Sequence, residues 1–263
     1  MRGNLIFEVS RFWATIILIG FCATTATAQR GGAPQMAPVD PHDLSGYWLL
    51  TIDGRKVPPS VLQPTVTKAM IQQHLDKDVH AIRWCNLLGT PFVMDPGVPI
   101  DIRVGTREMI IDTPTPADPR HIYFRPAHTS EDVLDPSTNG DSIAHWDGDT
   151  LIVDTIGFSP TRGITAIPGG GYKTATTHLV EEFKLLNNGA TLSVKSTWTD
   201  PKMFKTSHTY EYRYTRLAKT YEPTIGFACN PYDQARADFL GDPAPFKEET
   251  SASKATVSKR KTP

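Results

Sequence analysis

The chain has 263 residues, of which 39% are hydrophobic and 21% are charged, and its formal net charge is −1. This composition is typical of an ordinary globular protein and excludes a fibrous or wholly disordered chain. The near-neutral charge, with no stripe of lysine and arginine along the expected strands, argues against nucleic acid as a partner.

The N-terminus has the pattern of a secretory signal peptide. Arg2 and Arg11 are followed by the apolar run that ends in FCA, and the small residues A-T-A occupy positions 26–28. This run is too short for a comfortable membrane span, and no later segment is apolar enough for one. We therefore expect removal of residues 1–28 and a periplasmic or secreted mature chain that begins near Gln29.

The cysteines fit an oxidising compartment. A lipoprotein anchored at Cys22 is an alternative for the N-terminus, but Phe21 is bulky where lipoprotein signals usually have a small residue. Removal of the signal leaves Cys85 and Cys229, and neither has the CxxC or Cys-His spacing of a redox or metal site. We expect a disulfide between them, closing a loop of roughly 145 residues and contributing about 3 to 5 kcal/mol.

Composition divides the mature chain into three parts. Residues 29–42 are rich in Gly and Pro and predict a flexible leader, whereas residues 247–263 are rich in Lys, Ser and Thr and predict a disordered tail. Residues 43–246 show no break in composition and predict a single domain. One short helix is expected at 66–78, which contains neither Gly nor Pro.

The rest of the domain consists of short segments separated by turn residues, which predicts an all-β fold. The candidate strands are 46–52, 99–104, 107–113, 120–125, 141–146, 150–158, 177–186, 191–198 and 207–215. An antiparallel sheet of this many hairpin-linked strands must close or stack, and we favour a closed barrel. The sequence GYW at 46–48 is similar to the G-x-W that opens lipocalin-type barrels, so a lipocalin-like barrel is expected.

The segment DSIAHWDGDTLIVDTIGF predicts a hairpin with a two-residue turn. A turn at Asp147-Gly148 gives the pairs His145–Thr150, Ile143–Ile152 and Asp141–Asp154. Two carboxylates opposite each other beside aliphatic side chains are expected to share a proton. A register slip of one residue, or a three-residue loop, would abolish this pairing.

A second hairpin is predicted around Asn188-Gly189. A type I′ turn there gives the pairs Leu185–Leu192, Phe183–Val194, Glu181–Ser196 and Leu179–Trp198. One face of this hairpin is then apolar, with Glu181 as its only charge.

The strand SHTYEYRYT alternates sharply between its two faces. One face carries His208, Tyr210, Tyr212 and Tyr214, and we expect it to point inward. Together with Trp198 these rings form either a Tyr-rich core or a wall that binds an apolar or aromatic ligand.

The motif GDSIAHWDGDTLIVDTIGF, followed by HLVEEF, TWTDP and HTYEYRY, resembles a family of secreted bacterial proteins. Members commonly read GHSIGxWEGDTLVVDTxGF at this place, and the resemblance covers roughly residues 43–240. It implies a secreted protein but little about activity. This chain has Asp141 where the family usually has His, which replaces a His–Asp couple with two acids; His145 lies nearby on the same face and is a partial substitute.

Several enzyme classes lose their usual support, because the chain has no GxSxG, Walker or GxGxxG motif. No cofactor is expected. No HExxH or zinc-type spacing occurs, so no metal is expected either, although a cation held by Asp141, Asp154 and His145 is an alternative.

We expect a protein that binds a small apolar or aromatic molecule. The candidate ligand contacts are Trp198, His208, Tyr210 and Tyr212. A cofactor-free lyase, isomerase or cyclase is the first alternative, because acids and imidazoles can carry proton transfer. Its candidate catalytic residues are Asp154, Asp141, His145 and Glu181. A structural envelope protein is the second alternative.

Overall fold

The computed structural model describes residues 39–83, 88–115 and 117–223. The predicted signal peptide, the 247–263 tail and both cysteines of the expected disulfide, Cys85 and Cys229, lie outside the described residues. Within the described part of the chain, no helix has the length and apolar character needed to cross a bilayer.

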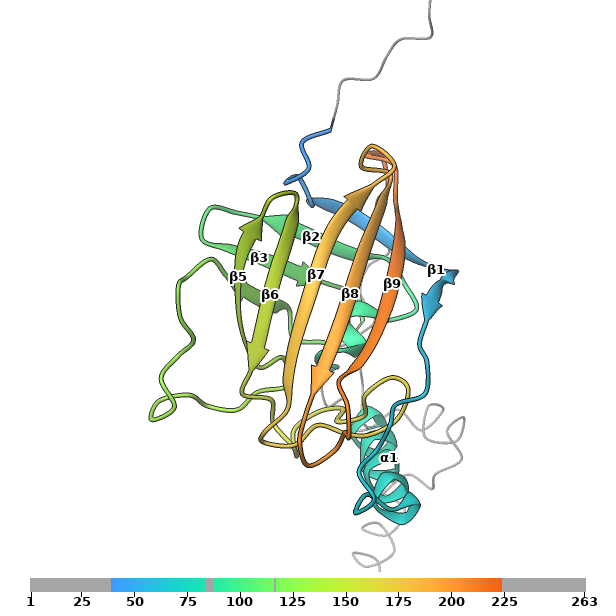
Figure 1. Cartoon of the computed structure of the whole chain (residues 1–263). Coiled ribbons are helices and arrows are strands. Elements are labelled where there is room, and N and C mark those ends of the chain that lie inside the picture. The colour runs from blue at the N-terminus through green and yellow to red at the C-terminus, as the bar shows by residue number, and fades with distance from the viewer. Residues whose placement is uncertain (1–38, 84–87, 116, 224–263) are drawn as a thin grey trace, which may run out of the picture. The chain divides into compact units, whose positions relative to one another are not determined.

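The described strands form a closed barrel in which each strand neighbours the next along the chain (Figure 1). The elements are β1 (Gly46–Lys56), α1 (Lys68–Arg83), a short 3-10 helix (Phe92–Met94), β2 (Ile100–Val104), β3 (Glu108–Asp112), β4 (Arg120–Tyr123), β5 (Asp141–Asp147), β6 (Thr150–Ile156), β7 (His178–Leu186), β8 (Thr191–Thr199) and β9 (His208–Arg216). Each predicted strand is present, and the barrel is confirmed. The helix is longer than the predicted 66–78.

The expectation of a wholly antiparallel sheet is wrong at one place, because β4 and β5 are parallel. They pair only through Ile122 with Ser142 and Tyr123 with Ile143. A parallel pair needs a crossover connection in place of a hairpin, and here residues 124–140 provide it. The end of this crossover loop lies beside the chain that leaves β6, where the Ser137 N–H donates to the Gly157 carbonyl at 3.1 Å.

Alternate residues of each strand fill the barrel with side chains. In β9 the buried residues are His208, Tyr210, Tyr212 and Tyr214, as the sequence predicted, while the residues between them face outward. Trp48 and Trp198 are fully buried in the same core.

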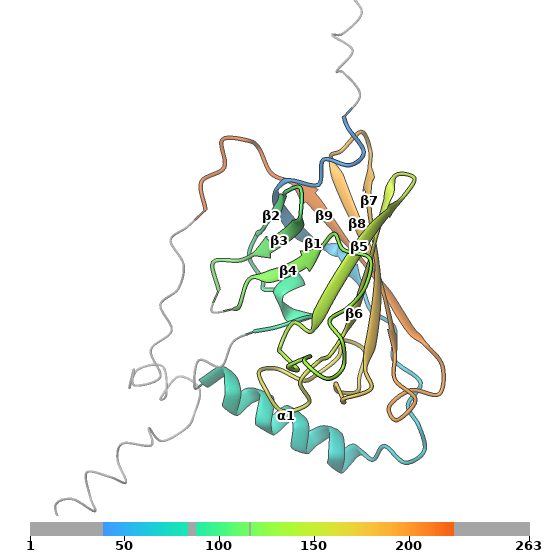
Figure 2. The same ribbon diagram turned by 90° about the vertical axis from the view of Figure 1, so that its left-hand side faces the viewer.

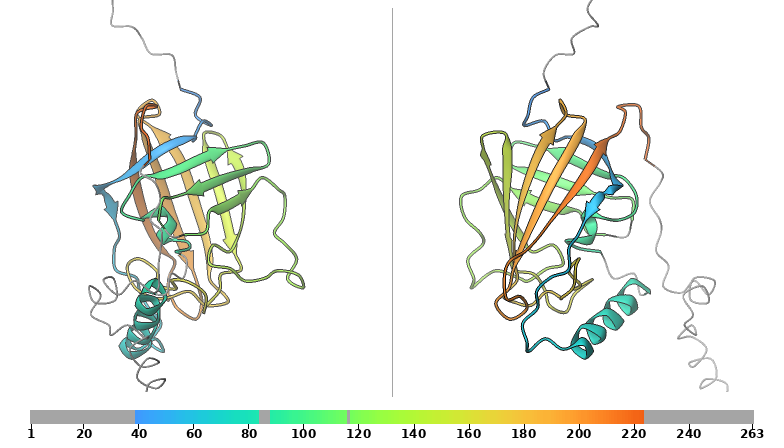
Figure 3. Two further views of the ribbon diagram at one scale, coloured as in Figure 1. Left: turned by 180° about the vertical axis from the view of Figure 1, so that it is seen from behind. Right: turned by 45° about the vertical axis from the view of Figure 1, so that its right-hand side comes forward.

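Helix α1 lies beside one end of the barrel (Figure 3). Its Asp78 accepts hydrogen bonds from the backbone N–H groups of Thr165 at 2.9 Å and Ala166 at 2.7 Å. One turn earlier, the His74 ring stacks on Tyr172 with centroids 3.6 Å apart. The helix is therefore attached to the long loop between β6 and β7.

Candidate functional site

The β5–β6 hairpin differs from the predicted register. Its pairs are Asp141–Ile156, Ile143–Asp154, His145–Ile152 and Asp147–Thr150. The turn residues are Gly148 and Asp149, and Gly148 has the positive φ of 56° that such a turn requires. Asp141 is therefore not opposite Asp154, and the predicted shared proton loses its geometric basis.

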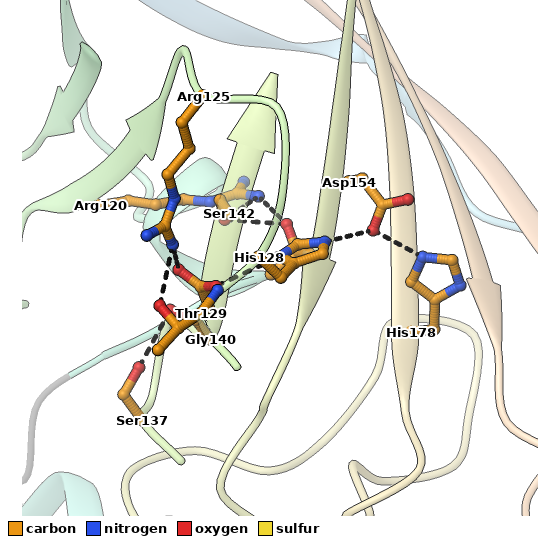
Figure 4. A network of polar contacts seen from close by, with 11 residues as sticks. Arg120, Arg125, His128, Thr129, Ser137, Gly140, Ser142, Asp154 and His178 are labelled. Carbon is orange, nitrogen blue, oxygen red and sulfur yellow. Dashed lines mark hydrogen bonds and ion pairs between the residues drawn. The ribbon is translucent and has the colours of Figure 1, made fainter. Parts of the chain in front are cut away.

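His128 of the crossover loop lies between these two acids, and Figure 4 shows its ring facing Asp154. Its Nδ1 is 3.2 Å from an oxygen of Asp141, and its Nε2 is 3.1 Å from an oxygen of Asp154. The ring thus joins two carboxylates that the hairpin itself holds apart.

Asp141 is fixed by groups on both sides of its carboxylate and is only 9% exposed. One oxygen accepts a charge-assisted hydrogen bond from Arg125, and the other accepts the Thr129 backbone N–H at 2.8 Å. Arg125 also donates to the Thr129 hydroxyl at 3.1 Å. Arg125, His128 and Thr129 all belong to the crossover loop, so the parallel β4–β5 connection builds this half of the site.

Asp154 points to the outside of the barrel and contacts a second imidazole. The Nε2 of His178, the first residue of β7, is 2.8 Å from the same Asp154 oxygen that faces His128. Both side chains are 38% exposed. Asp154 is consequently a partly solvated, doubly hydrogen-bonded acid, and not a carboxylate in the dry interior.

The hydrogen-bond pattern indicates which nitrogens carry protons. Ionised carboxylates only accept hydrogen bonds, so His128 satisfies both acids when its ring is protonated at both nitrogens. The contact with Asp154 assigns a proton to Nε2 of His178, which leaves Nδ1 of a neutral His178 as an acceptor. Figure 4 shows that this second nitrogen of His178 points away from the network.

Glu181 is not part of this group. It is buried on the inner face of β7, as predicted, and forms an ion pair with the fully buried Arg120 of β4. Arg120 also donates to the hydroxyl of Thr155 at 3.1 Å, and that hydroxyl lies 2.8 Å from the Ser142 hydroxyl. The sequence identified the isolated acid but not the cation on a distant strand that neutralises it.

The predicted ligand wall lies inside the barrel, and its polar atoms have protein partners. The Trp198 indole N–H donates to the Tyr210 hydroxyl at 3.1 Å, and the rings of Tyr210 and Tyr212 lie 5.0 Å apart. His208 Nε2 is 2.7 Å from the Pro168 carbonyl. Burial raises the pKa of Tyr210 and lowers the pKa of His208.

A cleft of about 540 Å³ opens elsewhere, where β5 leaves β4. Because β4 and β5 pair only near Tyr123, the second half of β5 separates from the β2–β3–β4 side of the barrel (Figure 2). The cleft is lined by His42, Val104, Gly105, Thr106, Phe124, Arg125, Pro126, Ala144, His145 and Trp146. The candidate catalytic residue His145 is exposed and borders this cleft.

The structure therefore separates the predicted site residues into three places. Asp141 and Asp154 belong to the network around His128, His145 belongs to the cleft, and Glu181 belongs to the interior. Sequence reasoning missed His128 and His178. The HLVEEF segment placed His178 on a strand, but no local pattern connects residue 128 to either acid.

The described residues contain no group of three or more His, Cys, Asp or Glu side chains arranged to hold a metal ion. Comparisons of the chain with protein-family models, with curated proteins and with solved structures gave no match. The site must therefore be interpreted from its own geometry.

Proposed function

We propose that this protein is a secreted or periplasmic barrel that binds a small apolar or aromatic molecule in the cleft beside Trp146. The observation that supports this proposal is the cleft itself, which opens where β5 separates from β4. Its volume of about 540 Å³ lies within the range of roughly 300 to 1,000 Å³ that is usual for small-molecule sites.

The lining of the cleft suits a ligand with an aromatic or aliphatic body. Trp146, Phe124 and Val104 supply apolar area, and the His42 ring lies against Trp146 with centroids 4.1 Å apart. Arg125 and His145 add hydrogen-bond donors at the border of this apolar surface. A few polar groups around an apolar floor orient a ligand without a large desolvation cost.

The proposal keeps the lipocalin-like role but moves its location. Lipocalin-type barrels hold ligands in the interior of an antiparallel barrel, whereas this barrel is mixed and its aromatic interior is packed. We therefore place the ligand at the β4–β5 separation, and we keep the resemblance to the secreted bacterial family as part of the proposal.

Titration with the uncharged fluorescent probe N-phenyl-1-naphthylamine tests the location. Trp146→Ala is expected to weaken probe binding about 10-fold, since loss of a large aromatic contact costs roughly 1 to 2 kcal/mol. Leu49→Ala removes an exposed apolar side chain of β1 that does not line the cleft, and it should leave the affinity unchanged.

Tyr210→Phe distinguishes the cleft from the interior wall. It removes the hydroxyl that accepts the Trp198 indole N–H and leaves the cleft intact. If Tyr210→Phe weakens probe binding and Trp146→Ala does not, the site is the interior wall and the proposed location is wrong. If the probe does not bind and mass spectrometry finds no small molecule with the purified protein, the proposal is wrong and the alternative of a structural envelope protein replaces it.

A further inference from the structure

We infer that His178 is the proton-transferring residue of a second site on the outer face of β6 and β7, and that Asp154, His128 and Asp141 position it. This inference does not depend on ligand binding in the cleft. It rests on a continuous set of contacts, Arg125–Asp141–His128–Asp154–His178, in which acidic and basic groups alternate (Figure 4).

The alternation gives each carboxylate a basic group on both sides. Asp141 lies between Arg125 and His128, and Asp154 lies between His128 and His178. The contact of Asp154 with Nε2 of His178 at 2.8 Å orients the imidazole and leaves its Nδ1 as the second ring nitrogen. A carboxylate that orients an imidazole in this way also stabilises the imidazolium that forms when the ring takes a proton.

The His178 side chain is partly exposed to solvent. The side chain is 38% exposed, and within the described residues its Nδ1 makes no hydrogen bond, in agreement with Figure 4. The cross-strand neighbours of Asp154 are Ile143 on β5 and Val180 on β7, and both are half-buried. An imidazole nitrogen beside aliphatic side chains suits a small apolar substrate.

An ordinary surface pair shows what distinguishes this site. His121 Nδ1 of β4 lies 2.7 Å from the Glu108 carboxylate of the neighbouring strand β3, and both side chains are partly exposed. Within the described part of the chain, neither a second imidazole nor a buried acid contacts that couple. It therefore provides a matched control with the same two functional groups.

The chemistry that fits the site is removal of a proton from carbon in a small apolar molecule with an acidic C–H bond, as in an elimination or isomerisation. The probe 5-nitrobenzisoxazole undergoes this step. His178 Nδ1 takes the C3 proton, and the C–H electron pair forms the third C–N bond of the nitrile. The N–O bond breaks with its electron pair on oxygen, so the ring opens to 2-cyano-4-nitrophenolate. No oxidant or reductant is needed, and the coloured phenolate measures the rate.

The test compares full-length variants with the probe at pH 7.5. His178→Gln is expected to lose about 10²-fold or more in kcat/KM, because a positioned general base typically contributes 10²- to 10⁴-fold. His121→Gln should keep the rate of the unmodified protein. Circular dichroism checks that His178→Gln, a substitution at a half-exposed strand position, is folded. A rate equal in the unmodified protein and in His178→Gln overturns the inference.

Asp154 is tested as a positioning residue through the division between kcat and KM. Asp154→Asn keeps the shape of the side chain and should lower kcat with little change in KM, since an orienting group acts on the transition state and not on binding. Asp154→Glu should recover part of the lost kcat, because it restores the carboxylate. If Asp154→Asn raises KM alone, or if Asn and Glu are equivalent, the positioning role is wrong.

Discussion

Lys173 is a buried cation that the barrel accommodates with neutral partners. Its Nζ donates to the backbone carbonyls of Thr90 at 2.8 Å and Thr138 at 3.2 Å, and it lies 5.3 Å from the centre of the Phe158 ring. Burial lowers the pKa of Lys173 from 10.5 to about 7. Lys173 thus connects the β6–β7 loop to the segments that contain Thr90 and Thr138. Its ammonium group loses its proton more readily than that of an exposed lysine.

This lowered pKa makes stability depend on pH. Between about pH 7 and 10.5 the unfolded chain holds a proton on Lys173 that the folded protein has released. The free energy of unfolding should therefore rise with pH in this window, by at most about 1.4 kcal/mol per pH unit from this group, and the contribution should be flat below pH 7.

Urea denaturation at several pH values measures this slope. Lys173→Met should remove the part of the slope that comes from Lys173, whereas Lys195→Met, which removes a half-exposed lysine paired with Glu182, should not. Equal slopes in the unmodified protein and in Lys173→Met would show that Lys173 does not release its proton in this range.

The interior ion pair of Arg120 and Glu181 gives a second prediction at the scale of single residues. Both side chains are buried, and within the described residues Arg120 Nε has no hydrogen-bond partner. Glu181→Gln leaves a buried guanidinium without its counter-charge and should lower the free energy of unfolding by about 3 to 5 kcal/mol. Chemical denaturation measures the loss.

A double substitution checks the cause of that loss. If the uncompensated charge is responsible, Arg120→Met combined with Glu181→Gln should be less destabilising than the sum of the two single changes. A strictly additive result would mean that the two side chains stabilise the core independently.

The two hairpins show what sequence reasoning could and could not reach at the scale of elements. The β7–β8 register is confirmed, with Glu181 opposite Ser196 and Leu179 opposite Trp198. Only one face of that hairpin is apolar, so a slip by one residue would place polar side chains in the core.

The hydrophobic pattern does not fix the register of the β5–β6 hairpin in the same way, because both of its faces are apolar. Leu151 and Val153 fill the interior, while Ile152 and Ile156 are half-buried on the outside. The sequence could not separate these alternatives because the outer face is partly covered by the distant 124–140 loop. The same loop carries His128, so the missed register and the missed histidine have one cause.

Two glycines of this hairpin region have positive φ for different reasons. Gly148 has φ 56° and open space around the position of a Cβ, whereas Gly140 has φ 70° and a Cβ there would lie 2.5 Å from the Ile156 carbonyl oxygen. Gly148→Ala should cost about 1 to 2 kcal/mol from backbone strain alone. Gly140→Ala should cost more and should displace the adjacent Asp141.

Thermal unfolding of the two variants gives the comparison directly. A lower midpoint for Gly140→Ala than for Gly148→Ala is expected, together with a loss of the His178-dependent reaction in Gly140→Ala only. Equal midpoints would mean that the chain beside Ile156 adjusts freely and that Asp141 is not held by this close approach.

At the scale of the whole molecule, one parallel pair determines where the cleft and the crossover loop lie. A barrel made only of hairpins would have a continuous wall, whereas the β4–β5 pair ends after Tyr123 and leaves a cleft beyond it. The crossover loop that the pair requires supplies Arg125 to that cleft and to the Asp141 network at once. Barrel closure was predictable from strand count and turn spacing, but the direction of a single strand was not.

The last prediction concerns the disulfide that we expect between Cys85 and Cys229, which both lie outside the described residues. In an oxidising compartment a disulfide between them would reduce the number of conformations open to the unfolded chain and stabilise the fold by about 3 to 5 kcal/mol.

Intact-mass measurement of protein isolated from the periplasm should show a chain that begins near Gln29. Alkylation should add no groups before reduction and two groups after it. Cys85→Ser should lower the urea midpoint of the non-reduced protein and leave that of the reduced protein nearly unchanged. Two alkylated thiols before reduction would show that the cysteines are free and that the barrel is stable without a covalent link.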